Sequence, residues 1–384
     1  MISHPKPIFL FFILCGVFNI FKLSAQSPCY STAHHEQQLE KRVYGQTQAW
    51  VEHIYREQWK DRKQSRFPSA NPGTFTIPVV IHLVHAPGLG MGQGSHLADA
   101  EVIAGLERLN EAMRGEALCP DQAGGVDIGI QFCLATRDIQ GHTTSGITRT
   151  ASPLTTVDVC TQEADLKTLS QQPVNRFPST DYLNIWLVTD ICASCQPFGC
   201  EAAGFATFPA QHGSDLDGFI TEAALWNPSD CDLFKAAVHE MGHYFNLYHT
   251  FEGGCQNDNC LTDGDKVCDT PPDAGQNFYT SNTCLQGIPP NTCSTDVNPL
   301  DPNNPFSADQ SDPTDNYMDY APPACAYTFT PDQALRMQSA LEGPRASLLT
   351  SRGCTPPCLD SLWAQLWVSD SLPVTGDTLS FSFT

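Results

Sequence analysis

Positive charge is scarce in this chain of 384 residues. Lys and Arg together number 20, against 42 Asp and Glu, so the formal net charge is −22. A surplus of negative charge repels nucleic-acid backbones and anionic membranes, which makes both poor partners. The same charge is compatible with binding of calcium or of a cationic substrate, although solubility alone also accounts for it.

Long apolar runs are missing as well. The longest one, residues 8–21, is too short for a comfortable membrane span. It follows Lys6 and precedes Leu23-Ser24-Ala25, which has the small residues of a cleavage site. We therefore predict that residues 1–25 are a signal peptide, and that the mature protein is secreted, monomeric and without a membrane span.

Cysteine is abundant by contrast. Cys15 is one of 17 cysteines and would leave with the signal peptide, so an even number remains after export. This number points to several disulfides in an oxidising compartment, but it does not fix their pairing. Cys192 and Cys195 have the spacing of a redox motif, which in an exported chain rich in cysteine we interpret as structural.

The order of segments predicts the fold class. Residues 26–72 are rich in Gln, Glu, Lys and Arg, are predicted to form one or two surface helices, and end in prolines and a glycine that mark a boundary. Apolar periodicity then predicts a helix at 98–114 and strands at 74–85, 128–135, 182–188 and 204–209. This order favours a mixed α/β sheet with helices packed against it.

The composition changes twice further along. From about 252 to 328, Asp, Asn, Pro, Gly and Cys dominate, so we expect an irregular region held by disulfides and by metal. A helix is predicted after Thr330. Residues 353–384 are predicted to begin a β-rich module, which leaves 73–352 as the main domain.

The clearest chemical signal lies in a predicted helix at 231–245. His239 and His243 are four residues apart, so their imidazoles share one helix face, about 6 Å apart along the axis, and can bind one zinc ion. Glu240 follows the first histidine and can act on a water at the metal without being a ligand. The structural alternative is a core helix with surface histidines.

A third ligand, His249, requires that the chain turn. On a continued helix it would lie about 15 Å beyond His239. Asn246 can end the helix in the left-handed conformation, for which Asn is the next choice after Gly. Three neutral imidazoles leave one position open, as in catalytic zinc sites, where zinc lowers the pKa of water toward ~7 and Glu240 would take the proton as general base.

The stretch H-E-M-G-H-Y-F-N-L-Y-H resembles the extended zinc motif of the metzincins, with Asn246 in place of the usual Gly. Three further segments follow in order, GDKVCDTPPD at 264–273, DNYMDY at 315–320 and FTPDQALRM at 329–337. Together they resemble the pappalysin family, in particular its short bacterial members. The resemblance covers about residues 75–345.

The resemblance implies a fold and an activity. The fold is metzincin-like, with a mixed twisted sheet, a backing helix and an active-site helix above an irregular lower subdomain stabilised by disulfides and calcium. The activity is that of a secreted zinc metalloendopeptidase with Glu240 as general base. Met318 would form a hydrophobic floor beneath the histidines, and Tyr320 would stabilise the tetrahedral intermediate.

The resemblance also implies a calcium site. Its ligands would be Asp265, Thr270 and the carbonyl of Val267, because oxygen atoms of a tight loop suit this cation. The alternative is a solvated acidic turn. The family further suggests that Cys325 pairs with a cysteine between residues 255 and 293, for which we choose Cys293.

Residues 26–72 would be a pro-segment in this family. A thiolate of Cys29 could take the fourth zinc position and keep the enzyme inactive, or Cys29 could instead form a disulfide.

Family members often cut before Arg or Lys by means of an acidic residue near the end of the Met318 segment. Residues 321–324 contain no acid, so we do not expect this preference here.

The expected substrate is a protein or peptide, extended along an edge strand at 204–209. One alternative is a catalytically inactive binding or adhesion protein on the same fold, against which the intact Glu240 argues. Another is a zinc hydrolase of a non-peptide amide, against which an edge strand above the zinc would argue.

Overall fold

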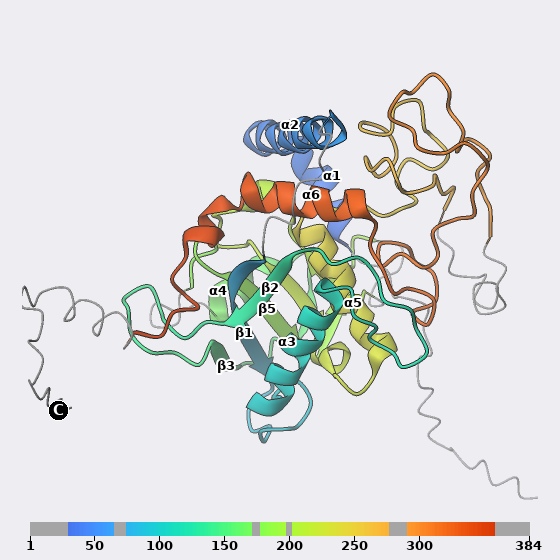
Figure 1. The fold of residues 1–384 in the computed structure, drawn as a ribbon. Helices are drawn as coiled ribbons and strands as arrows, with labels where there is room; N and C mark the ends of the chain where they lie inside the picture. The colour runs from blue at the N-terminus through green and yellow to red at the C-terminus, as the bar shows by residue number, and fades with distance from the viewer. Residues whose placement is uncertain (1–29, 65–73, 171–176, 197–201, 276–289, 358–384) are drawn as a thin grey trace, which may run out of the picture.

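The computed structural model describes residues 30–64, 74–170, 177–196, 202–275 and 290–357. Its centre is a six-stranded sheet in the order β2-β1-β5-β8-β7, with β3 on the same side of β1 as β2 (Figure 1). The strands are β1 (Phe75–His85), β2 (Ile130–Leu134), β3 (Ile147–Ala151), β5 (Leu183–Val188), β7 (Gly204–Ala206) and β8 (Phe219–Glu222). The predicted mixed α/β sheet is confirmed, since all pairs are parallel except β7 with β8.

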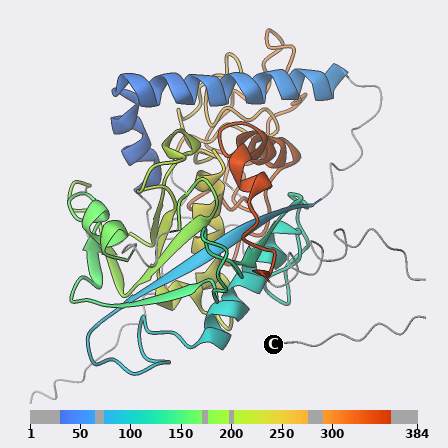
Figure 2. The same cartoon turned by 90° about the vertical axis from the view of Figure 1, so that its left-hand side faces the viewer.

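The long strand β1 organises the sheet (Figure 2). Its first half pairs with β2, from Phe75 opposite Ile130, and its second half pairs with β3, from Ile81 opposite Ile147. From Ile77 onward every residue of β1 is buried. Burial on both faces explains why this strand has a continuous apolar sequence rather than an alternating one.

Helices cover both faces of the sheet. One face packs against α3 (Asp99–Met113) and α5 (Cys231–Tyr244), through a core that also includes residues of α6 (Pro331–Glu342). The opposite face packs against α4 (Glu163–Ser170) and against the small parallel sheet of β4 (Thr156–Asp158) and β6 (Asp190–Cys192). Three short 3₁₀ helices complete the elements, η1 (Pro209–Gln211), η2 (Ala223–Trp226) and η3 (Ala346–Thr350).

Side chains cap the two helices that matter most for the site. Asp230 accepts a hydrogen bond from the backbone N–H of Leu233 at the start of α5. At the start of α6, Thr330 and Gln333 each bond the backbone of the other, and Pro331 occupies the first turn. These caps satisfy backbone donors that have no partner inside a helix.

The N-terminal segment forms two helices, α1 (Ser31–Leu39) and α2 (Arg42–Gln64). In both views α2 lies across α6, on the opposite side of α6 from the sheet (Figures 1 and 2). The prediction of helices is confirmed. Their description as surface helices is incomplete, because Ser31 and His35 of α1 and one face of α2 are buried against the rest of the chain.

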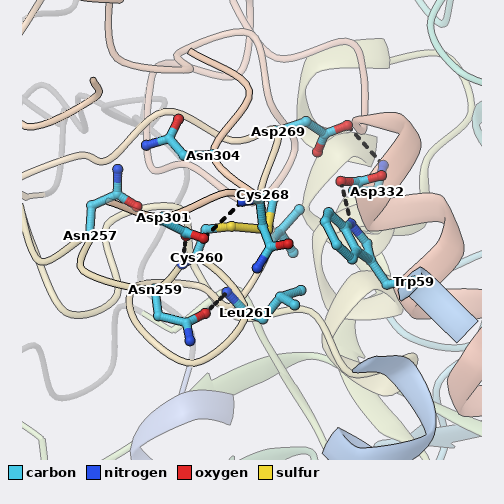
Figure 3. The surroundings of a disulfide bond; sticks show 12 residues. Trp59, Asn257, Asn259, Cys260, Leu261, Cys268, Asp269, Asp301, Asn304 and Asp332 are labelled. Carbon is cyan, nitrogen blue, oxygen red and sulfur yellow. Dashed lines mark hydrogen bonds between the residues drawn. A yellow bond between two sulfur atoms is a disulfide. The ribbon is translucent and has the colours of Figure 1, made fainter. Parts of the chain in front are cut away.

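The irregular region is confirmed in the part that the structure describes. Between Phe251 and Thr330 the described residues contain no helix or extended strand. Disulfides Cys255–Cys293 and Cys260–Cys268 link its loops, and Figure 3 shows the second of these beside Trp59 of α2. Among the described residues, the part of the molecule built around the sheet has three further disulfides, Cys119–Cys231, Cys133–Cys354 and Cys160–Cys195.

One predicted disulfide is wrong. Cys293 pairs with Cys255, their Cα atoms being 5.4 Å apart, so it cannot bond Cys325, which is itself disulfide-bonded. Linear spacing could not reveal which loops meet. Cys192 and Cys195 are both disulfide-bonded, Cys195 to Cys160, which confirms their structural role.

Several short elements escaped prediction, namely β3, β4, α4, β6 and β8. They are three to eight residues long and mix polar with apolar side chains, as in ITRTA and FITE. Cys29 and residues 358–384, which include most of the predicted β-rich module, lie outside the described residues. Among the residues described, no helix combines the length and the apolar character needed to cross a bilayer.

Candidate active site

Three buried histidines converge at the end of α5. His239 and His243 project from the last turns of this helix, and His249 returns to them from beyond it. The Nε2 atom of His243 lies 3.0 Å from that of His239 and 3.1 Å from that of His249. The three can hold one metal ion, so the predicted meeting of the distant third histidine with the first two is confirmed.

Asn246 provides the turn that brings His249 back. Its φ is +79°, the left-handed conformation that was expected of it. The N–H of Asn246 donates to the carbonyl of His243, and the N–H of Leu247 donates to that of Gly242, both at 2.9 Å. This is the Schellman arrangement that ends many helices.

Two buried arginines hold the same helix end, which the sequence did not reveal. Arg336 of α6 donates through Nε to the carbonyl of Asn246 at 2.7 Å. Arg345 donates through Nε to the carbonyl of Tyr244 at 2.9 Å, while its other nitrogens bond the buried Asp217. They satisfy carbonyls that a helix terminus leaves without intrahelical partners. Arg336 belongs to the segment FTPDQALRM at 329–337, but its neighbours in the sequence do not indicate that it binds the end of α5.

The histidines are oriented and neutral. His239 donates through Nδ1 to the carbonyl of Tyr317, and His243 through Nδ1 to that of Leu247, each at 2.7 Å. Each Nε2 therefore presents a lone pair toward the others rather than a proton. Burial lowers the pKa of His239 to about 4 and the pKa of His243 and His249 well below the ordinary value. Neutral imidazoles with converging lone pairs are the donor set that zinc binds.

Glu240 lies beneath the edge strand β7. A Cβ atom at Gly204 would be 2.6 Å from Glu240 Oε1 and 2.7 Å from Cδ, so only glycine fits against this carboxylate. Sequence analysis missed Gly204, because its partner lies in a helix that begins 27 residues later. The predicted edge position of this strand is confirmed, since β7 is the last strand of the sheet.

Met318 packs directly under α5. It is fully buried, and a Cβ atom at Gly242 would overlap its sulfur. The carbonyl of Met318 accepts a hydrogen bond from the N–H of Thr250 at 3.3 Å, next to the third histidine. Met318 thus lies against the helix that carries His239 and His243, and its role as a floor beneath the histidines stays a prediction.

Tyr320 lies beside two of the histidines. Its ring centroid is 4.7 Å from that of His249 and 5.6 Å from that of His239. Phe251, which sequence analysis did not single out, stacks on His249 at 4.7 Å and touches Tyr320 from the other side. The side chain predicted to stabilise a reaction intermediate is therefore next to the metal-binding cluster.

Comparison with known proteins identifies the segment that holds this cluster. Residues 170–342 match the family model of peptidase M43, described as pregnancy-associated plasma protein-A. Through this segment the chain is similar to the peptidase M43, or pappalysin, family. The expected resemblance is confirmed.

Fungal proteins are among the relatives of this chain. Over 150 residues this chain is 39% identical to an extracellular metalloprotease of Pyricularia oryzae. The matched stretch covers 37% of this chain and 44% of that protein. Over 184 residues this chain is 32% identical to one of Verticillium alfalfae, covering 46% and 55% respectively. The chain thus spans about half the length of these relatives. Their extracellular location agrees with the several disulfides seen here.

Solved structures show the same fold. Mature mirolysin of Tannerella forsythia in complex with a cleaved peptide is 26% identical, with a TM-score of 0.53, covering 72% of this chain and 96% of that one. A mutant of promirolysin from the same organism is 24% identical, with a TM-score of 0.56, covering 84% and 97%. This likeness confirms the metzincin-like architecture.

The loop at 264–273 brings the three predicted calcium ligands together. Thr270 Oγ1 is 2.8 Å from Asp265 Oδ2 and 3.0 Å from the carbonyl oxygen of Val267. The N–H of Val267 donates to Asp265 Oδ1 at 3.0 Å. Burial raises the pKa of Asp265 to about 8. The ligands meet as expected, and calcium itself stays a prediction.

Helix α1 begins inside the candidate active site. Ser31 Oγ donates to Glu240 Oε2 at 2.8 Å and accepts from the N–H of Ala206, in the edge strand, at 2.7 Å. Thr32 Oγ1 is 3.3 Å from Nδ1 of His249. The first turn of α1 therefore covers the predicted general base and a backbone donor of the edge strand at once. Sequence analysis considered only Cys29 in this role.

Proposed function

We propose that this chain is the latent form of a secreted zinc metalloendopeptidase. The observation that supports this most directly is the meeting of three neutral imidazoles with Glu240 under an edge strand. Zinc bound to His239, His243 and His249 would lower the pKa of water and polarise a carbonyl group. The substrate class would be proteins or peptides.

Glu240 would act as general base. Its Oε2 atom already accepts a hydrogen bond from the hydroxyl group of Ser31. A donor that takes the place of Ser31 can therefore transfer its proton to the same oxygen. A water between the histidines and Glu240 is such a donor. The proton can then pass from Glu240 to the leaving amine.

The edge strand β7 would bind the substrate backbone. The N–H of Ala206 points out of the sheet toward Ser31 Oγ, and once α1 has left it can donate to a carbonyl of an extended peptide. Tyr320, beside His239 and His249, would supply a hydroxyl for the developing oxyanion. Met318 would keep the histidines in place from below.

We propose that residues 26–72 are the pro-segment that keeps the enzyme latent. The contacts of Ser31 and Thr32 support this, as does the larger coverage of the fold likeness to promirolysin, 84% against 72% for the mature form. Cys29, two residues before Ser31, would act as an additional metal ligand or form a disulfide. Calcium at Asp265, Val267 and Thr270 would stabilise the lower subdomain.

A cleavage assay on a mixed peptide library tests the proposal. The full-length chain should cleave no peptides. After limited trypsin digestion at the basic residues before Phe75, it should cleave them. Activity should disappear in Glu240→Ala and with a chelator, while Glu240→Ala remains folded. A wild-type chain that stays silent after removal of the segment, yet binds zinc, would favour the inactive binding protein. Cleavage of other amides alone would favour the non-peptide hydrolase.

A further inference from the structure

A buried ion pair joins the N-terminal segment to the enzyme body. Glu52 of α2 receives two hydrogen bonds from the guanidinium of Arg336, Nη2 to Oε1 at 2.6 Å and Nη1 to Oε2 at 3.0 Å. Arg336 is fully buried and Glu52 is 6% exposed. Paired parallel bonds of this kind recognise a carboxylate by shape as well as by charge.

A second cation and a phenol of the enzyme body also lie beside this carboxylate, and within α2 Gln48 Nε2 donates to Glu52 Oε1 at 2.9 Å. Lys266 Nζ lies 3.8 Å from Glu52 Oε1 and donates to Tyr248 Oη at 3.1 Å. The Tyr248 hydroxyl is itself 3.4 Å from Glu52 Oε1. Lys266 and Arg336 both lie over the Tyr248 ring, at 4.2 and 5.3 Å from its centroid.

Arg336, Lys266 and Tyr248 belong to the enzyme body, whereas Glu52 belongs to the N-terminal segment. Among the described residues, the ion pairs of both Arg336 and Lys266 are with Glu52. Removal of the N-terminal segment therefore takes away the carboxylate and leaves the two cations with Tyr248. Arg336 stays oriented, because its Nε remains bonded to the carbonyl of Asn246. The three remaining side chains, here called the receptor, would offer another carboxylate the same donors.

The receptor is close to the reacting atoms. Tyr248 precedes the third histidine directly. His35 reaches the Tyr248 hydroxyl at 3.0 Å, while Ser31, four residues earlier in the same helix, reaches Glu240. Four helical residues rise about 6 Å. An extended peptide covers that distance in about two residues.

We propose that Arg336, Lys266 and Tyr248 form a substrate subsite for an acidic side chain. Glu52 fills it in the latent chain, and a Glu or Asp of the substrate, two to four residues from the scissile bond, fills it in the active one. This proposal rests on the proposed peptidase function and adds the substrate class that the site prefers.

Matched peptides test the subsite. The wild-type chain, expressed whole and activated by limited trypsin digestion, is given peptides in which Glu or Gln occupies each of four positions on either side of the cleaved bond. We expect kcat/KM to be about tenfold higher for Glu than for Gln at one position, mainly through KM, as for a hydrogen bond to a charged group. The preference should weaken as the salt concentration rises.

Two variants tie this preference to the proposed residues. Lys266 has a φ of +62°, so Lys266→Asn removes the charge with a residue that tolerates this conformation. It should lower the ratio of kcat/KM for the Glu peptide to that for the Gln peptide about threefold, and Arg336→Lys should bring this ratio to about one. Arg114→Gln, which removes a half-buried charge just after α3, serves as the control and should leave the ratio unchanged.

Binding gives a readout that does not depend on turnover. The same peptides, labelled, are titrated into the activated Glu240→Ala chain and followed by fluorescence anisotropy. The Kd should favour Glu over Gln at the same position, and Lys266→Asn should weaken that difference. Equal binding and equal cleavage of Glu and Gln peptides at all positions would overturn the subsite. A chain that binds Glu peptides preferentially but cuts none would instead refute the peptidase function alone.

Discussion

The space beside Glu240 yields a sharp prediction, because Gly204 leaves no room for a side chain. A methyl group there would lie 2.6 Å from Oε1 of Glu240 and 2.7 Å from its Cδ. Atoms of this kind normally approach to about 3.5 Å. Gly204→Ala must therefore move the carboxylate or strand β7 by about 1 Å, and a shift of that size at a reacting group costs about 100-fold in rate.

Steady-state kinetics on the activated chain measure this effect. We expect kcat to fall about 100-fold and KM to change little, because the carboxylate can rotate away more easily than the paired strand can shift. Overpacking should also cost about 1–3 kcal/mol, which thermal unfolding detects without loss of the fold. Gly275→Ala is the control, since a Cβ atom there meets nothing within 4 Å. Wild-type kcat in Gly204→Ala would refute the assignment of Glu240 as general base in this geometry.

Three further predictions concern the turn, the pro-segment and the metal. Asn246→Gly should keep zinc, whereas Asn246→Val should lose about 1–2 kcal/mol of stability and release zinc more readily, as zinc titration and thermal unfolding would show. Burial alone would raise the pKa of Glu52, but Arg336 and Lys266 lower it from an ordinary 4.5 to about 2. The ionised Glu52 therefore contributes about 3 kcal/mol to docking of the N-terminal segment. This contribution is complete above about pH 4.5 and is lost as the pH falls through 2. Hydrogen exchange of α2 should therefore speed up over this range in the wild type but not in Glu52→Gln, where docking is already weak. Removal of zinc should lower the melting temperature, and zinc at 100 times its Kd should restore about 2.7 kcal/mol, an effect absent from His243→Ala.

The sequence could predict the parts of the site that depend on local spacing. His239, Glu240 and His243 share one helix, and the bend at Asn246 is set by the conformational preference of a single residue. Contacts between distant segments could not be predicted in the same way. Nothing near Gly204 in the sequence indicates that Glu240 will lie against it, and nothing near Tyr317 indicates that its carbonyl will orient His239.

The same distinction explains the fold. The apolar segments 77–85 and 182–188 are buried on both faces, so their composition was sufficient to predict strands. Short strands such as β3 and β8 owe their conformation to pairing with neighbours, which their own residues do not encode. The pairing of Cys293 failed for a related reason, because the folds of two irregular loops, rather than their sequence spacing, bring Cys255 within reach.

The three histidines proposed to bind zinc also join the part of the molecule built around the sheet to the irregular region. His239 lies on a helix that is rigid because it packs into the main core, yet its Nδ1 bonds the carbonyl of Tyr317, in the region without helices or strands. One residue further, Met318 presses on Gly242 of the same helix. A metal that fixes the histidines therefore also fixes the Met318–Tyr320 segment, whose own surroundings hold little regular structure. Binding of zinc and positioning of Tyr320 should accordingly be one event rather than two, since neither part can shift without displacing a ligand.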